Sequence, residues 1–145
     1  MKKYKELKIG IIGCGYWATN IIKTLEKLNI KNISTFDKDT SKVNLIKKKF
    51  PFTKNIKSLN DLIKLDLDCF FLITPASTHY EIAKKILKNK KDIFVEKPAT
   101  LKTKNIKELI KISNQNKNIL MSGYIYNYNV FINYIKNILK KNILG

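Results

Sequence analysis

The chain has 145 residues, of which 44% are hydrophobic and 10% aromatic. This is enough for one globular domain with its own core, and it argues against a disordered chain. No apolar run approaches the roughly 20 residues that a membrane-spanning helix needs. The formal net charge is +18, but all 29 basic residues are lysines, and base readout relies on the planar fork of arginine.

The lysines are spread along the whole chain instead of forming one basic block. We therefore interpret them as solvated surface positions and predict no dedicated nucleic-acid site. Nonspecific attraction to polyanions at low salt stays open, because net charge alone can produce it.

The N-terminus and the cysteines bear on the cellular setting. Only a short predicted strand, Leu7–Ile12, follows the basic start of the chain before two glycines interrupt the run. A signal peptide needs a longer apolar stretch, so we expect a cytoplasmic protein. Cys14 and Cys69 form no C-x-x-C pair, so we predict no metal site and interpret both as buried free thiols.

In chain order, short β-rich runs alternate with amphipathic helical stretches, which is typical of a parallel sheet with helices on both faces. The predicted strands are 7–12, 32–36, 52–53, 68–74, 93–95 and 119–123. The predicted helices are 16–28, 41–49, a short one from 58, 78–87 and 103–114. The predicted fold class is therefore α/β, a doubly wound parallel sheet of about six strands.

Two helix starts carry a capping-box pattern, in which a hydroxyl residue is followed three positions later by an acid. The pairs are Ser58 with Asp61 and Thr78 with Glu81. Both pairs predict that the helix begins directly after the hydroxyl residue.

The end of the chain reads differently from the rest. Residues 124–145 place Phe131, Ile135 and Ile138 at helical spacing, without a further strand. We predict a domain of residues 1–123 and a following segment of residues 124–145. Since nothing in the alternating pattern covers this apolar face, we expect it to be exposed.

A glycine-rich turn links the first predicted strand to the first predicted helix. Gly13, Gly15 and Ala18 match the G-x-G-x-x-G/A fingerprint of dinucleotide-binding, Rossmann-type folds. Gly13 permits the tight turn, Gly15 lets the backbone approach a pyrophosphate, and Ala18 lets the helix pack closely on the strand. Tyr16 and Trp17 lie inside the same loop, where the first amides of the helix point at the phosphates.

An acidic residue supports the nucleotide interpretation. Asp37 ends the second predicted strand, where a carboxylate accepts hydrogen bonds from the ribose hydroxyls of NAD. A carboxylate there also repels the 2′-phosphate of NADP, so NAD is favoured. The neighbouring Lys38 can partner a phosphate, which keeps NADP possible. The alternative is that the glycines only form a turn and Asp37 only caps the loop.

Two further loops follow predicted strands, and ligands of this fold bind beyond the carboxyl ends of strands. The first contains Thr74, Pro75 and His79, the only histidine of the chain. A single histidine is as readily a packing residue as a catalyst. The second is Glu96-Lys97-Pro98, where a lysine can polarise or protonate a substrate oxygen and a proline can adopt a cis bond.

Taken together, three blocks of the sequence resemble the family of glucose–fructose oxidoreductase and inositol dehydrogenase (Gfo/Idh/MocA), in its N-terminal Rossmann domain. The blocks are 13–20, 74–80 and the Glu-Lys-Pro sequence at 96–98. The resemblance implies an NAD- or NADP-dependent oxidoreductase that acts on hydroxyl or carbonyl groups of sugars, sugar nucleotides or cyclitols. It also implies a homo-oligomeric full-length enzyme and a C-terminal substrate domain that these residues do not contain.

The resemblance also assigns roles to residues. Lys97 resembles the lysine that contacts the reacting hydroxyl, and Glu96 the carboxylate near the nicotinamide. Thr74, Pro75 and His79 resemble the loop beside the cofactor. In other places the sequence departs from the family pattern, because Tyr124 and Val130 stand where members often have His and Pro. Besides an oxidoreductase domain, a non-catalytic nucleotide-binding module or sensor is therefore an alternative.

Overall fold

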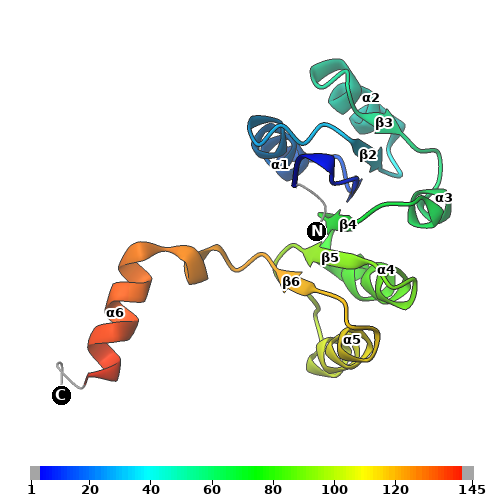
Figure 1. The fold of residues 1–145 in the computed structure, drawn as a ribbon. Helices are drawn as coiled ribbons and strands as arrows, with labels where there is room; N and C mark the ends of the chain where they lie inside the picture. Colours follow the sequence, from blue (N-terminus) through cyan, green and yellow to red (C-terminus); the bar gives the residue numbers. More distant parts are fainter. Residues whose placement is uncertain (1–3, 142–145) are drawn as a thin grey trace.

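A computed structural model describes residues 4–141 of the chain. Its centre is a sheet of six parallel strands in the order β3-β2-β1-β4-β5-β6. The strands are β1 (Ile9–Ile12), β2 (Ile33–Phe36), β3 (Lys54–Asn55), β4 (Cys69–Leu72), β5 (Asp92–Val95) and β6 (Leu120–Ser122). The chain builds outward from β1 to β3, returns to the centre and builds outward again from β4 to β6 (Figure 1). This is the doubly wound order, with its switch point between β1 and β4, and it confirms the predicted fold class.

The helices cover both faces of the sheet. They are α1 (Tyr16–Lys27), α2 (Thr40–Lys49), α3 (Leu59–Lys64), α4 (Ala76–Lys88), α5 (Thr103–Asn116) and α6 (Val130–Lys140), with short 3₁₀ helices η1 (Tyr4–Glu6) and η2 (Ile125–Tyr128). One apolar core lies under α1 and α2, and the other lies under α3, α4 and α5. Neighbouring residues of β1 alternate between the two cores, since Ile11 faces the first and Ile12 the second.

Two of the predicted boundaries are wrong. The strand expected at Phe52–Thr53 lies two residues later, as β3, because Phe52 packs against a core and the Thr53 hydroxyl donates to the carbonyl of Phe50. The capping box expected at Thr78 is absent, because α4 already starts at Ala76 with Pro75 at its N-cap. The Thr78 hydroxyl instead donates to the carbonyl of Pro75 at 2.7 Å.

The other capping prediction is confirmed. The amide of Asp61 donates to the Ser58 hydroxyl at 3.0 Å, and α3 follows directly. The remaining strands and helices fall where the pattern placed them, with bounds shifted by at most two residues at their ends. Such shifts are expected because element ends fray and lack periodicity.

Both cysteines are free thiols, as predicted, but only Cys14 is buried, whereas Cys69 is half-buried. Burial raises the pKa of Cys14 to about 12 and that of Cys69 to about 11. Both side chains therefore stay protonated near neutral pH.

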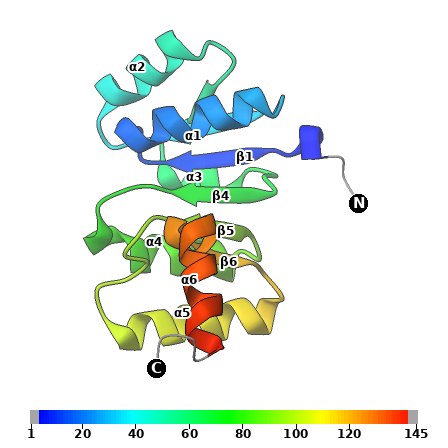
Figure 2. The same cartoon turned by 90° about the vertical axis from the view of Figure 1, so that its left-hand side faces the viewer.

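The last helix differs from the others in its surroundings. No residue of α6 is buried, and its packing is chiefly on η2. Figure 1 shows α6 standing apart from the layers of the domain, and in Figure 2, turned by 90°, it lies in front of them. Across residues 4–141, no helix combines the length and the apolar character that crossing a membrane would require.

Candidate cofactor-binding site

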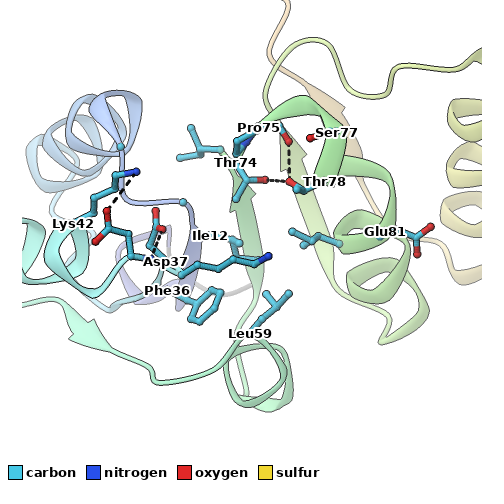
Figure 3. Close-up of a pocket in the computed structure, with 16 residues that line it drawn as sticks. Ile12, Phe36, Asp37, Lys42, Leu59, Thr74, Pro75, Ser77, Thr78 and Glu81 are labelled. Atoms are coloured by element: carbon cyan, nitrogen blue, oxygen red, sulfur yellow. Dashed lines mark hydrogen bonds and ion pairs between the residues drawn. The ribbon is translucent and has the colours of Figure 1, made fainter.

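A cavity of about 860 Å³ opens at the carboxyl ends of β1, β2 and β4. Its walls come from the turn after β1, the end of β2, the start of α2 and the loop into α4 (Figure 3). Gly13, Gly15, Asp37, Lys38, Thr74 and Pro75 all line it. The cavity therefore lies at the switch point, where this fold binds its ligands, and it joins the glycine turn, the end of β2 and the loop after β4.

The two glycines of the turn have different surroundings. Gly13 has a φ of +97°, and a Cβ on it would lie 2.7 Å from the carbonyl oxygen of Ile73. Gly15 caps α1 with ordinary extended backbone, and nothing lies within 4 Å of where its Cβ would be. The fold thus requires glycine at position 13, whereas position 15 borders open space in the cavity wall.

The N-terminus of α1 has no side-chain cap, so the first amides of the helix are available to an anion. Ala18 is fully buried one turn into the helix and lets α1 lie close to the sheet. A dinucleotide fits this arrangement, because the open space at Gly15 lies where its phosphates would meet the helix amides.

Asp37 connects the end of β2 with the glycine turn. Its carboxylate accepts hydrogen bonds from the amides of Cys14 at 2.7 Å and of Asp39 at 2.9 Å. The loop-capping role considered above is therefore real. A carboxylate has about four acceptor positions, so Asp37 retains capacity for ribose hydroxyls on its cavity side. Lys38 and Lys42 line the same cavity.

The aromatic pair of the turn lies beside the large cavity. Tyr16 and Trp17 are exposed and meet edge to face at 5.7 Å between ring centroids. Tyr16 lines a second cavity of about 700 Å³, together with Cys14 and several lysines of α2. The wall of neither cavity includes Trp17.

The loop after β4 divides its residues between two roles. Thr74 and Pro75 line the large cavity, and the Thr74 hydroxyl is 2.7 Å from that of Thr78. His79 does not line it, because its side chain is buried beneath the loop. Its Nε2 lies 2.7 Å from the carbonyl oxygen of Thr74 and its Nδ1 lies 2.9 Å from that of Pro98.

The Glu-Lys-Pro turn follows β5, the neighbour of β4, so it lies along the same edge of the sheet. The Lys97–Pro98 bond is cis, as the sequence suggested. Lys97 is exposed, and its amide donates to the Glu96 carboxylate at 3.0 Å. Neither residue lines the two cavities, so the turn stands beside the nucleotide cleft.

Some residues of the site were not foreseen. Phe36, Leu59 and Ile82 give the cavity an apolar wall opposite the glycine turn. They come from a strand end and two helices, and no sequence motif assigns them to a ligand, so only their three-dimensional neighbourhood reveals them. Within residues 4–141, no three His, Cys, Asp or Glu side chains gather in a way that would hold a metal.

A doubly wound parallel sheet with this glycine turn, this acid after β2 and a cavity at the switch point defines a Rossmann domain that binds a dinucleotide. The family model described as "Oxidoreductase family, NAD-binding Rossmann fold" (Gfo/Idh/MocA) matches residues 7–124. The chain therefore belongs to this family, as its NAD-binding domain.

Individual relatives agree with this assignment. The 2,7-anhydro-N-acetylneuraminate hydratase of Escherichia coli is 26% identical over 96% of the chain and 37% of its own length. The WlbA dehydrogenase of Chromobacterium violaceum, solved with NADH and UDP-GlcNAcA, superposes with a TM-score of 0.84 at 20% identity over 94% of the chain and 40% of its own. The scyllo-inositol dehydrogenase of Lactobacillus casei gives a TM-score of 0.81 at 21% identity over 99% of the chain and 44% of its own. The chain thus spans about two-fifths of the length of the proteins it matches.

Proposed function

We propose that this chain is the cofactor-binding part of an enzyme that moves a hydride between NAD(H) and a hydroxyl or carbonyl carbon of a sugar, sugar nucleotide or cyclitol. The observation that carries the proposal is the convergence, at one edge of the sheet, of the glycine turn, Asp37 and the Lys97 turn. The named substrates of the dehydrogenase neighbours support the substrate class.

Each group has a role in this proposal. The nicotinamide supplies or accepts the hydride. The turn at Gly13 and Gly15 and the amides of α1 hold the phosphates, while Asp37 accepts hydrogen bonds from the ribose. Lys97 holds or moves the proton of the substrate oxygen, and Glu96 keeps the turn in place beside the nicotinamide. Thr74 and Pro75 form the wall beside the cofactor.

NAD(H) is the preferred cofactor under this proposal. The Asp37 carboxylate opposes a 2′-phosphate, whereas Lys38 and Lys42 in the same cavity attract one. The acid is fixed by two backbone amides, while the lysines are exposed and mobile on long side chains. We therefore expect NADH to bind more tightly than NADPH, with NADPH still measurable.

The first test is a titration of the chain with NADH and NADPH, followed through Trp17, the only tryptophan. Trp17 is the second residue of α1, directly after the glycine turn, and should transfer its excitation energy to a nicotinamide bound nearby. We expect saturable quenching with sensitised NADH emission. Asp37→Ala should weaken NADH binding by roughly tenfold, the value of a hydrogen bond to a charged group.

Glu6→Ala is the matched control, because it removes an exposed carboxylate on η1 that lines neither cavity. It should leave the NADH affinity unchanged. A folded sample that responds to neither nucleotide would disprove the proposal. Binding of NADH without turnover of any sugar, sugar nucleotide or inositol, even with a supplied substrate domain, would favour the non-catalytic module instead.

A further inference from the structure

His79 occupies an unusual position for a residue of the cofactor loop. It belongs to the first turn of α4, and its side chain is only 1% exposed. One ring nitrogen faces the carbonyl oxygen of Thr74 at 2.7 Å, and the other faces that of Pro98 at 2.9 Å. The ring therefore spans the gap between the loop after β4 and the turn after β5.

The two segments that the ring joins have different tasks. Thr74 contributes to the wall of the cofactor cavity. Pro98 completes the turn that presents Lys97. The regular sheet pairing of β4 with β5 ends at Leu72 and Val95, with one more bond from the amide of Glu96 to the carbonyl of Leu72. Beyond that point the polar contacts of the imidazole ring link the two loops, while Ala99, the residue after Pro98, is buried in the same core as α4.

The same turn is packed from its other side by Gly123, the residue after β6. A Cβ at Gly123 would lie 3.2 Å from Oε2 of Glu96 and 3.0 Å from the ring of Phe94. The amide of Gly123 donates to the carbonyl of Val95 at 2.9 Å, so its backbone cannot easily withdraw. Glu96 is therefore confined by Gly123, while its carboxylate accepts the amide of Lys97 at 3.0 Å.

We propose that His79 is a positioning residue, whose buried ring fixes the Lys97 turn to the loop that lines the cofactor cavity, with Gly123 confining the turn from the side of β6. This inference rests on the proposed function, because only a Lys97 that acts on the substrate oxygen needs to be held in place. A reactive group on an exposed turn needs such support, since a displacement of about 1 Å can cost much of its activity. His79 thus acts through Lys97 and contacts no reacting atom.

A histidine suits this position for a geometric reason. The two nitrogens lie in the plane of the rigid ring and point in different directions, so one ring reaches both carbonyl oxygens. The neutral ring donates to one of them, and the protonated ring donates to both. A glutamine side chain carries both of its N–H groups on a single nitrogen. His79→Gln therefore keeps a polar side chain of similar size but can no longer bridge the two loops.

The test measures whether binding of NADH in the cofactor cavity changes the reactivity of Lys97. The rate at which each lysine is acylated is measured by mass spectrometry, once without NADH and once with saturating NADH. In the unaltered chain we expect NADH to slow acylation of Lys97 severalfold relative to Lys104, an exposed lysine of α5. In His79→Gln and in Gly123→Ala we expect that protection to be lost, while the affinity for NADH stays within about twofold, because neither residue lines the cavity.

Ser113→Ala is the matched control for the loss of a buried hydrogen bond. The Ser113 hydroxyl donates to the carbonyl of Asn118 at 2.6 Å and is remote in sequence from both loops. This variant should keep the protection of Lys97. A merely structural role of His79 would lower stability in the same way as Ser113→Ala and would leave the protection intact.

The outcomes separate the two proposals. If the unaltered chain does not bind NADH, the proposed function fails. If it binds NADH but Lys97 is not protected, or remains protected in His79→Gln, the positioning role is overturned while cofactor binding stands. If His79→Gln does not fold, Gly123→Ala decides, and protection retained in that variant overturns the proposal.

Discussion

At the scale of single residues, one glycine of the turn is required by the fold and the other by ligand binding. Gly13 lies in the left-handed region with backbone atoms of Ile73 directly against it. Gly15 has an ordinary conformation, and no protein atom is close to the position of its missing side chain. The first glycine is therefore explained by the fold, whereas the second is explained only by a ligand that approaches its backbone.

This difference predicts opposite effects of two matched substitutions. Gly13→Ala should lower the free energy of unfolding by about 2 kcal/mol or more, because of the positive φ and the contact with backbone. Gly15→Ala should change it by less than about 0.5 kcal/mol, yet weaken binding of NADH strongly. Thermal or urea unfolding, together with the NADH titration, measures both. Loss of stability in Gly15→Ala with unchanged NADH affinity would contradict this interpretation.

The residues of the site differ in how far the sequence foretold them. Gly13, Gly15 and Asp37 carry local signals, because the turn and the strand end that they need are short-range features. One contact of His79 depends on Pro98, 19 residues away, and that of Gly123 depends on a glutamate 27 residues away. No local pattern encodes such contacts. Only the pairing of β4, β5 and β6 brings these residues together.

At the scale of elements, α4 and α5 are joined by a polar cluster on the face away from the cofactor turn. Lys84 lies 2.7 Å from the Glu108 carboxylate, and the Tyr80 hydroxyl donates to the same carboxylate at 2.6 Å. Hydrogen bonds from Lys84 and Tyr80 lower the pKa of Glu108 below its ordinary value of 4.5. Hydrogen bonds with Glu108 and Tyr80 raise the pKa of Lys84. The cluster therefore orients α5 against α4 in its charged form.

The lowered pKa of Glu108 sets the pH range in which this cluster stabilises the protein. A depressed carboxyl pKa contributes stability above the ordinary value, and this contribution is lost as the pH falls through the folded value. Glu108→Gln should therefore lower the Tm at pH 7, with the difference from the unaltered chain shrinking below about pH 4.5. The effect should be modest because the pair is partly exposed.

Glu81→Gln on the exposed side of α4 is the control for this experiment. It removes one carboxylate outside the cluster and should show no comparable pH-dependent loss of Tm. A Tm difference for Glu108→Gln that persists unchanged in acid would mean that packing of the side chain, and not its charge, holds α5 in place.

The boundaries of helices and strands were predicted less well than the elements themselves. The helices with apolar stripes were predicted well, because burial of one face fixes their period. The two-residue strand β3 has both residues exposed and no periodicity. The strand was therefore predicted at the nearby apolar Phe52, which is the wrong position. At α4, the proline before Ala76 sets the start of the helix and overrides the capping pattern two residues later.

At the scale of the whole molecule, the surface combines a high positive charge with a concentrated apolar region. Large apolar or aromatic side chains are exposed along η2 and α6, which we call the tail surface. Its members are Tyr124, Ile125, Tyr126, Tyr128, Val130, Phe131, Tyr134, Ile135 and Leu139. Phe131, Ile135 and Ile138 were all expected to be exposed; the first two are, whereas Ile138 is half-buried. A stretch of this kind is far more apolar than the surface of a typical monomer.

Because the tail surface has no cover within residues 4–141, we predict that copies of this chain associate through it. The net charge of +18 opposes association at low ionic strength, and salt screens that repulsion over about 10 Å at 0.1 M. Association should therefore increase with both concentration and salt, which is the reverse of an assembly held by surface ion pairs. Sedimentation velocity at two salt concentrations measures it.

A pair of variants assigns the association to its surface. Phe131→Gln with Ile135→Gln removes two exposed apolar side chains of α6 and should shift the chain toward a monomer of 16.9 kDa. Leu45→Gln, at 66% exposure on α2, removes an equally accessible apolar side chain elsewhere and should leave the association unchanged. Monomeric behaviour of the unaltered chain at high concentration and high salt would refute the prediction, since apolar burial is the one force here that screening cannot weaken.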